Sequence, residues 1–203
     1  MSKLPVSYQA IEFKQLFIPS FGMCIVASAI WYFSGFHLPW FGSLDFASIA
    51  LCMIAVVVAY AAIYGITCHA WLNTVEMRQL NRKLTGMFQN LSWPQLIILS
   101  ISAGVGEELL FRGLLQTWLI ANLNPLWGIL GASLVFGLMH YLNATYIILT
   151  FVLGCLFGIA YHMTNSLLMV MAAHTLYDII AFGVIVKFPY LLNSEPRSGG
   201  FDA

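Results

Sequence analysis

The chain has 203 residues, of which 61% are hydrophobic and only 8% are charged. A soluble domain carries about 25% charged and about 45–50% apolar residues, so the composition excludes that class as well as disordered, collagenous and disulfide-rich chains. Eight basic and eight acidic residues cancel, which argues against nucleic-acid binding, because that requires a basic face. We therefore expect an all-α, polytopic bundle of transmembrane helices.

Six apolar stretches are predicted to cross the membrane. They cover residues 16–36, 45–68, 93–123, 126–141, 145–163 and 166–186. About 20 apolar residues cross a bilayer core of ~30 Å, so the third stretch is longer than one crossing. It must be tilted, protruding or broken near Gly104 and Gly106. The polar segment 73–90 predicts a surface loop or an amphipathic helix at the interface.

The basic residues predict the orientation, because Lys and Arg accumulate in cytoplasmic loops. They precede the first stretch, follow the second and follow the last, at Lys3, Lys14, Arg78, Arg82, Lys83, Lys187 and Arg197. Six spans with both termini cytoplasmic place all seven on one side. The first apolar stretch continues past Ala27-Ser28-Ala29, which resembles a cleavage site, so we expect a retained span rather than a signal peptide.

Charged residues are rare in the second half of the chain. Between residues 92 and 186 they are Glu107, Glu108, Arg112 and Asp178, and all four stand in apolar stretches. A charge at the bilayer centre costs at least about 2.5–3.5 kcal/mol, so intramembrane charges indicate function. Arg112 follows Glu108 by one helical turn and can pair with it. Glu107 points about 100° away and keeps no helical partner.

Two interpretations of these charges remain open. In the structural one, an ion pair joins helices and Glu107 lies near the interface. In the functional one, Glu107 is an unpaired carboxylate facing a polar cavity, where it can act as a base.

Three histidines lie in the same half of the sequence. His140 ends the fourth stretch, and His162 lies at a span end, where we expect an interfacial residue. His174 and Asp178 share one face of the last stretch, and a carboxylate there can fix the tautomer of the imidazole. Each of these residues could also form only a hydrogen bond between helices. Together with Glu107 they supply the parts of amide hydrolysis around one water molecule.

The three motifs Glu107-Glu108-x-x-x-Arg112, Phe136-x-x-x-His140 and His174-x-x-x-Asp178 resemble, in order, those of the CPBP family. That family includes the type II CAAX prenyl endopeptidases and the bacterial Abi proteins, some of them linked to bacteriocin self-immunity. The resemblance covers residues 92–182. The zinc-protease motif H-E-x-x-H and the serine motif G-x-S-x-G are absent from the sequence.

The resemblance implies a membrane-embedded glutamate-type endopeptidase. Glu107 would activate the water, and His140 and His174 would position the water and the substrate carbonyl, with Glu108 and Arg112 as supporting partners. The last motif residue of the family is often Asn, and here it is Asp178. An amide can donate a hydrogen bond to an oxyanion, whereas an ionised carboxylate cannot. Asp178 is therefore protonated, orients His174 or helps to hold a cation.

Three segments are expected: 1–91 with two transmembrane helices and a cytoplasmic polar segment, 92–188 as the protease core, and 189–203 as a tail. The expected substrate is a membrane-associated protein or peptide, with or without a prenyl group, among membrane lipids. The short length favours a bacterial-type member in the inner (plasma) membrane. No cofactor is expected. The alternatives are a Zn²⁺ enzyme that uses His140, His174 and Glu107, and a non-catalytic immunity, binding or transport protein.

Overall fold

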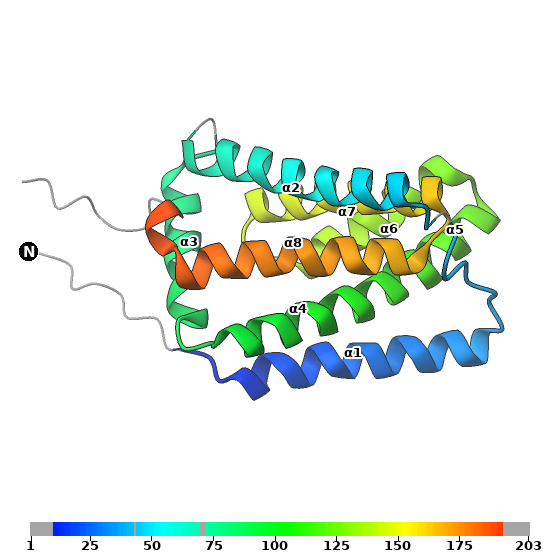
Figure 1. Cartoon of the computed structure of the whole chain (residues 1–203), viewed down its shortest axis with the longest axis horizontal. Helices are drawn as coiled ribbons and strands as arrows, with labels where there is room; N and C mark the ends of the chain where they lie inside the picture. Colours follow the sequence, from blue (N-terminus) through cyan, green and yellow to red (C-terminus); the bar gives the residue numbers. More distant parts are fainter. Residues whose placement is uncertain (1–9, 43, 70–71, 193–203) are drawn as a thin grey trace, which may run out of the picture.

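The computed structural model describes residues 10–42, 44–69 and 72–192. Lys3, Arg197 and most of the expected tail 189–203 lie outside them. The described residues form helices and connecting loops without a strand, which confirms the all-α fold class. The longer helices run along one common axis, and α3 lies across one end of them (Figure 1). Their bounds are α1 Phe13–Ser34, α2 Phe46–His69, α3 Val75–Phe88, α4 Trp93–Glu108, η1 Leu109–Gln116, α5 Thr117–Asn122, α6 Pro125–Met139, α7 Ala144–Thr164, α8 Leu167–Lys187 and η2 Pro189–Leu192.

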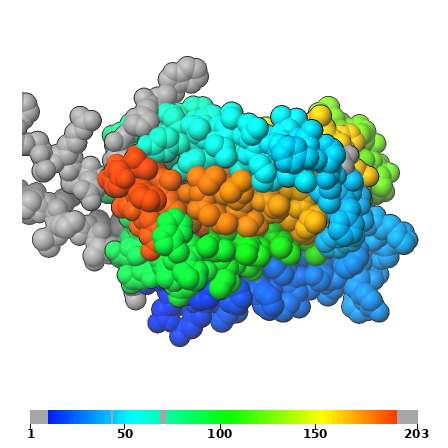
Figure 2. All heavy atoms as spheres, viewed as in Figure 1, coloured from blue at the N-terminus to red at the C-terminus, as the bar shows by residue number. Residues whose placement is uncertain are grey.

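Several helices are long and apolar enough to cross a membrane. Among the described residues α1, α2, α7 and α8 meet that requirement by length and composition, and α6 is a shorter apolar helix. Figure 2 shows α2, α8, α4 and α1 next to one another on one face of the molecule. Large apolar side chains such as Phe21 on α1 and Val58 on α2 are exposed on the surface of the molecule. The chain is a polytopic helical membrane protein, as its composition predicts.

The polar segment after the second apolar stretch is the amphipathic helix α3. Thr74 caps its N-terminus, since the Thr74 hydroxyl accepts a hydrogen bond of 3.2 Å from the backbone N–H of Met77. The apolar side of α3 buries Met77, Leu80 and Leu84 against the ends of α7 and α8. The charged residues of α3 lie on the other side, which is the arrangement expected of a helix in the interfacial plane.

Polar residues begin the helices of the second half. Asn124, Asn143 and Ser166 each cap the helix that follows: their side-chain oxygens accept hydrogen bonds of 3.0, 2.7 and 3.2 Å from backbone N–H groups of the first turn. The caps satisfy N–H groups that a helix leaves unpaired at its start. Asn165 adopts the left-handed conformation with φ 49°, which allows the sharp turn between α7 and α8.

The long third stretch is not broken at Gly104 and Gly106. Both glycines lie inside α4, where they allow neighbouring helices to approach. A Cβ at Gly104 would lie 3.0 Å from the Met171 carbonyl oxygen on α8, and a Cβ at Gly106 would lie 2.9 Å from Cys24 Sγ on α1. The irregular part is η1, an eight-residue π-helix that begins directly after Glu108. Such wide turns are frequent at functional sites.

Two further glycines bring α7 close to the π-helix and to α6. The spacing Gly154-x-x-x-Gly158 predicts close helix packing, and the structure confirms it. A Cβ at Gly154 would lie 3.1 Å from the Ser133 Cβ, and one at Gly158 would lie 2.7 Å from Gln116 Oε1. The carbonyl oxygen of Gly158 accepts a hydrogen bond of 3.0 Å from Gln116 Nε2. The continuous helix α4–η1, which carries Glu107 and Glu108, is thereby held against α7.

Candidate active site

The polar residues of the second half meet at one cavity of about 220 Å³ between α1, α4, α6, α7 and α8. Phe88, the last residue of α3, also lines it. The cavity therefore lies toward the α3 end of the bundle. Its polar lining residues are Ser20, Glu107, His140, Tyr146, His174 and Asp178. Residues far apart in sequence thus share one space of the size of a few water molecules or a short peptide segment.

Glu107 faces both site histidines. Its Oε2 lies 3.6 Å from His140 Nε2 and 3.8 Å from His174 Nε2. Both distances exceed a direct hydrogen bond but suit a bridging water molecule. The oxygen is buried, and within the described part of the chain it has no hydrogen-bond partner. A buried carboxylate oxygen without a partner is costly, so this atom is positioned for something that the protein itself does not supply.

His140 is held by the helix that it ends. Its Nδ1 lies 2.8 Å from the Phe136 carbonyl oxygen. A carbonyl can only accept, so we assign the hydrogen to Nδ1. The other nitrogen, Nε2, is then the one that faces Glu107. The Phe136-x-x-x-His140 spacing therefore sets both the position and the tautomer of the imidazole.

His174 is oriented by Glu108. Its Nδ1 lies 2.7 Å from Glu108 Oε1, and both side chains are buried. Asp178 lies on the opposite side of the ring, with Oδ2 3.6 Å from Nε2. Glu108, and not Asp178, therefore forms the direct hydrogen bond that orients His174. Sequence reasoning did not detect this contact, because no local spacing joins α4 to α8.

Arg112 completes the buried support of Glu108. Its Nη1 donates to Glu108 Oε1 across 3.0 Å, which confirms the predicted pairing. Its Nη2 donates to the Gly154 carbonyl oxygen across 2.9 Å. The guanidinium also lies over the Phe136 ring at 4.7 Å, a cation–π distance. The two glutamates therefore differ in environment: Glu108 Oε1 accepts hydrogen bonds from Arg112 and His174, whereas Glu107 Oε2 forms no hydrogen bond within the described residues and faces the two Nε2 atoms.

Tyr146 is a member of the cavity that sequence reasoning missed. It stands in the first turn of α7, and its side chain lines the cavity beside Glu107 and Asp178. One tyrosine in an apolar stretch gives no signal that separates it from the other tyrosines of the chain. Only the packing of α7 against α8 and α3 brings it to the site.

The geometry gives no support to the zinc alternative. His140, His174 and Glu107 were its expected ligands. Across the described ranges, no group of three or more His, Cys, Asp or Glu side chains is arranged to hold a metal ion.

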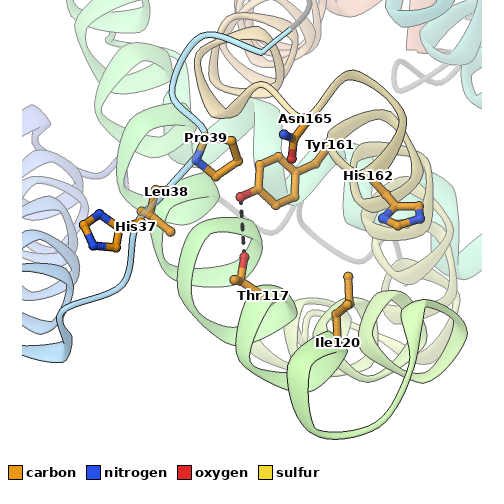
Figure 3. Close-up of a pocket in the computed structure, with 8 residues that line it drawn as sticks. All are labelled: His37, Leu38, Pro39, Thr117, Ile120, Tyr161, His162 and Asn165. Carbon is orange, nitrogen blue, oxygen red and sulfur yellow. Dashed lines mark hydrogen bonds between the residues drawn. The ribbon is translucent and has the colours of Figure 1, made fainter.

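His162 does not belong to this cavity. It lines a second one, of about 510 Å³, together with His37 and Asn165 (Figure 3). There the Tyr161 and Thr117 hydroxyl groups lie 3.4 Å apart. This cavity lies where α5, the end of α7 and the loop before α2 meet, at the end of the bundle opposite α3 (Figure 1). Of the three histidines, the structure thus brings His140 and His174 to Glu107 and leaves His162 apart.

Comparison with known proteins agrees with the motif pattern. Residues 89–180 match the family model described as type II CAAX prenyl endopeptidase Rce1-like. The chain is also 26% identical to the uncharacterized protein YpbD of Bacillus subtilis (strain 168), over 165 residues that make up 80% of this chain and 76% of that protein. No solved structure matches the chain.

These findings place the chain in a class. It is a polytopic helical membrane protein, and the residues that line the candidate cavity come mainly from the helices between α4 and α8. Residues 89–180 are similar to the Rce1-like domain of the type II CAAX prenyl endopeptidases, the CPBP family. The resemblance inferred from the three motifs is confirmed.

Proposed function

We propose that the chain is an intramembrane endopeptidase. It hydrolyses a peptide bond in a membrane-associated protein or peptide, with a water molecule activated by Glu107. The observation that carries the proposal is the Glu107 Oε2 atom, which is buried, unpartnered among the described residues, and directed at two imidazole nitrogens. The family match supports hydrolytic chemistry of this type.

The proposed reaction begins with a water molecule between Glu107 and the two imidazoles. Glu107 removes one proton, and the hydroxide attacks the carbonyl carbon of the scissile bond. The electron pair of the carbonyl moves to its oxygen. When the tetrahedral intermediate collapses, Glu107 returns its proton to the leaving nitrogen. The imidazoles hold the water in line, as positioned groups do in general base catalysis.

The supporting residues keep this geometry in a low-dielectric interior. Glu108 holds His174 through Nδ1, and Arg112 neutralises Glu108. A carboxylate whose Oε1 is held by a guanidinium and an imidazole makes a poor base, because its negative charge is already stabilised by these two buried contacts. Glu107 is therefore assigned as the base and Glu108 as the positioning residue.

For the topology we propose six crossings, formed by α1, α2, the continuous α4–η1–α5 helix, α6, α7 and α8. Both termini and α3 then face the cytoplasm. The proposal is supported by the basic residues, which lie at the α3 end of the bundle (Figure 1): Lys14, Arg78, Arg82, Lys83 and Lys187. The sequence of the opposite connections, 35–45, 123–125 and 165–166, contains neither Lys nor Arg. The cavity would accordingly open toward the cytoplasmic side.

Cleavage of defined peptides tests the activity. Purified protein in liposomes is incubated with quenched-fluorescence CAAX peptides, one farnesylated and one unmodified, and the products are identified by mass spectrometry. We expect cleavage by the parent chain and none by Glu107→Gln. The matched control is Glu76→Gln, which makes the same change at an exposed position of α3 and should cleave as the parent does.

A second readout does not depend on the choice of peptide. The membrane proteins of cells that carry the parent chain are compared with those of cells that carry Glu107→Gln. If the chain is an endopeptidase, at least one membrane protein should accumulate uncut in cells that carry the variant. Full cleavage by Glu107→Gln, or identical membrane proteins in both strains together with no peptide cleavage, would instead favour a non-catalytic binding or immunity protein.

A further inference from the structure

The cavity is rich in hydrogen-bond acceptors and poor in donors. Glu107 and Asp178 are acceptors when ionised. His140 carries its hydrogen on Nδ1, which is used by the Phe136 carbonyl. His174 uses Nδ1 for Glu108. In neutral rings the two Nε2 atoms that face Glu107 can only accept as well.

Peptide hydrolysis needs a donor at the carbonyl oxygen, where negative charge develops in the transition state. The other nearby side-chain donors are engaged or lie outside the cavity. Ser20 Oγ donates to Ser102 Oγ across 3.1 Å. Arg112 Nη1 and Nη2 donate to Glu108 and to the Gly154 carbonyl, and although Arg112 Nε has no partner within the described residues, Arg112 does not line the cavity.

Tyr146 is the hydroxyl that lines the cavity and is not engaged in this way. Its backbone N–H is fixed by the Asn143 side chain at 2.7 Å. Its ring packs against the apolar side of α3, beside Met77, Leu80 and Leu84. Within the described residues its hydroxyl group has no hydrogen-bond partner. Glu107 and Asp178 line the same cavity as Tyr146.

We propose that the Tyr146 hydroxyl is a catalytic group, which donates a hydrogen bond to the oxyanion of the scissile carbonyl. This inference rests on the proposed endopeptidase function and adds one residue to it. As water attacks the carbonyl carbon and Glu107 takes the water's proton, the carbonyl electron pair moves to oxygen. The Tyr146 O–H stabilises that charge through its hydrogen bond and keeps its proton. Collapse of the intermediate restores the carbonyl and releases the hydrogen bond.

Asp178 explains why a donor on another helix is needed. It occupies the same cavity as Tyr146, but as a carboxylate it cannot donate. An asparagine at that position would offer two N–H donors. Tyr146 and an amide at 178 should therefore be partly interchangeable, which a merely structural tyrosine would not be.

The test is Tyr146→Phe, which removes only the hydroxyl. It is assayed as reconstituted full-length protein on whichever of the two CAAX peptides the parent chain cleaves. Loss of one oxyanion donor typically lowers kcat by about 100- to 1,000-fold. We expect a fall of about that size in kcat, less than about a threefold change in KM, and an unchanged Tm. Tyr60→Phe, at a half-buried tyrosine of α2 that lines a neighbouring cavity, is the matched control and should cleave normally.

Rescue by a second donor separates this role from packing. The effect of Tyr146→Phe is measured again in the Asp178→Asn background, where we expect a loss at least about tenfold smaller. The proposal is overturned if Tyr146→Phe keeps kcat within about threefold of the parent chain, if its Tm falls with its activity, or if the loss is equal in both backgrounds. The Glu107→Gln variant separates a failure of the endopeptidase mechanism from a failure of the Tyr146 role alone. An active Glu107→Gln overturns the endopeptidase mechanism, whereas an inactive Glu107→Gln beside an active Tyr146→Phe overturns only the role of Tyr146.

Discussion

Glu108 and His174 are joined by a hydrogen bond of 2.7 Å although 66 positions separate them in the chain. The contact connects the end of α4 to the middle of α8 and turns Nε2 of the imidazole toward Glu107. Because Arg112 shares the same Glu108 oxygen, one buried carboxylate holds a cation and an imidazole together. Removal of this carboxylate should therefore affect the fold as well as the reaction.

Substitutions at the two glutamates should have different effects on stability. Glu107→Gln should abolish turnover while Tm stays unchanged or rises, since a buried and unpaired oxygen is removed. Glu108→Gln should lower both activity and Tm, because it leaves Arg112 buried without its counter-charge, a loss that typically costs about 3–5 kcal/mol. Cleavage rates and thermal unfolding of the two variants at matched expression measure this. A Tm for Glu108→Gln equal to that of the parent chain would contradict it.

A double variant controls for the stranded charge. In Glu108→Gln with Arg112→Met, the uncompensated cation is gone, and a flexible apolar side chain fills its place between the Phe136 and Phe157 rings. We expect Tm to recover relative to Glu108→Gln alone, while activity does not, because His174 still lacks its carboxylate partner.

Substitutions of the two histidines should also differ in their effect on Tm. His140 is 28% exposed and bonds only to its own helix, whereas His174 is 5% exposed and bonds across the bundle. Replacement of either by Gln should lower kcat by about 100- to 10,000-fold, the usual contribution of a positioned acid–base group. Only His174→Gln should lower Tm as well. Equal unfolding temperatures for both variants would show that the bond to Glu108 adds no stability.

Asp178 can be assigned by comparing two substitutions. Asp178→Asn keeps the size of the side chain and adds donors, so activity should survive at a reduced or comparable level. Asp178→Ala should be worse. If Asp178 instead holds a metal ion, Asn is a poorer ligand, and activity should fall steeply and recover in part with added Zn²⁺. An Ala variant as active as the parent chain would reduce the site to Glu107, His140, His174 and Tyr146.

The close approach of α4 to its neighbours should make Gly104 intolerant of a side chain. Gly104→Ala would place a Cβ against Thr175 and 3.0 Å from the Met171 carbonyl oxygen, which should cost about 1–3 kcal/mol of stability as overpacking does in other cores. The matched control is Gly22→Ala on α1, where a Cβ has nothing within 4 Å. Thermal unfolding in detergent measures the difference, and equal Tm values for both variants would refute it.

The proposed topology predicts where reporter domains lie. Fusions placed after Arg82 and at the C-terminus should both report the cytoplasm, because the basic residues gather at the α3 end of the bundle. A fusion in the loop before α2, which has no Lys or Arg, should report the opposite side. If the Arg82 and C-terminal fusions report different sides, the helix from α4 to α5 does not form a single crossing.

Local sequence patterns predicted the helices and one contact of the site. The apolar runs predict the helices because a membrane span needs length and apolarity, and i, i+4 spacing predicts the Glu108–Arg112 pair because helix geometry is fixed. The bond from Glu108 to His174 could not be predicted, since it depends on the packing of α4 against α8. Tyr146 was missed for the same reason. The π-helix after Glu108 was also missed, because the sequence gives no signal for a change in backbone hydrogen bonding.

The shortness of α6 has a consequence for the bilayer around the site. Its 15 residues span about 22 Å at 1.5 Å per residue, less than the ~30 Å hydrocarbon thickness that a crossing helix must match. A span that is too short is accommodated by local thinning of the lipid layer. If α6 crosses the bilayer as proposed, thinning at its His140 end would bring the bilayer surface closer to the candidate cavity. Because the proposed hydrolysis consumes one water per turnover, such thinning would shorten the path along which bulk water reaches Glu107.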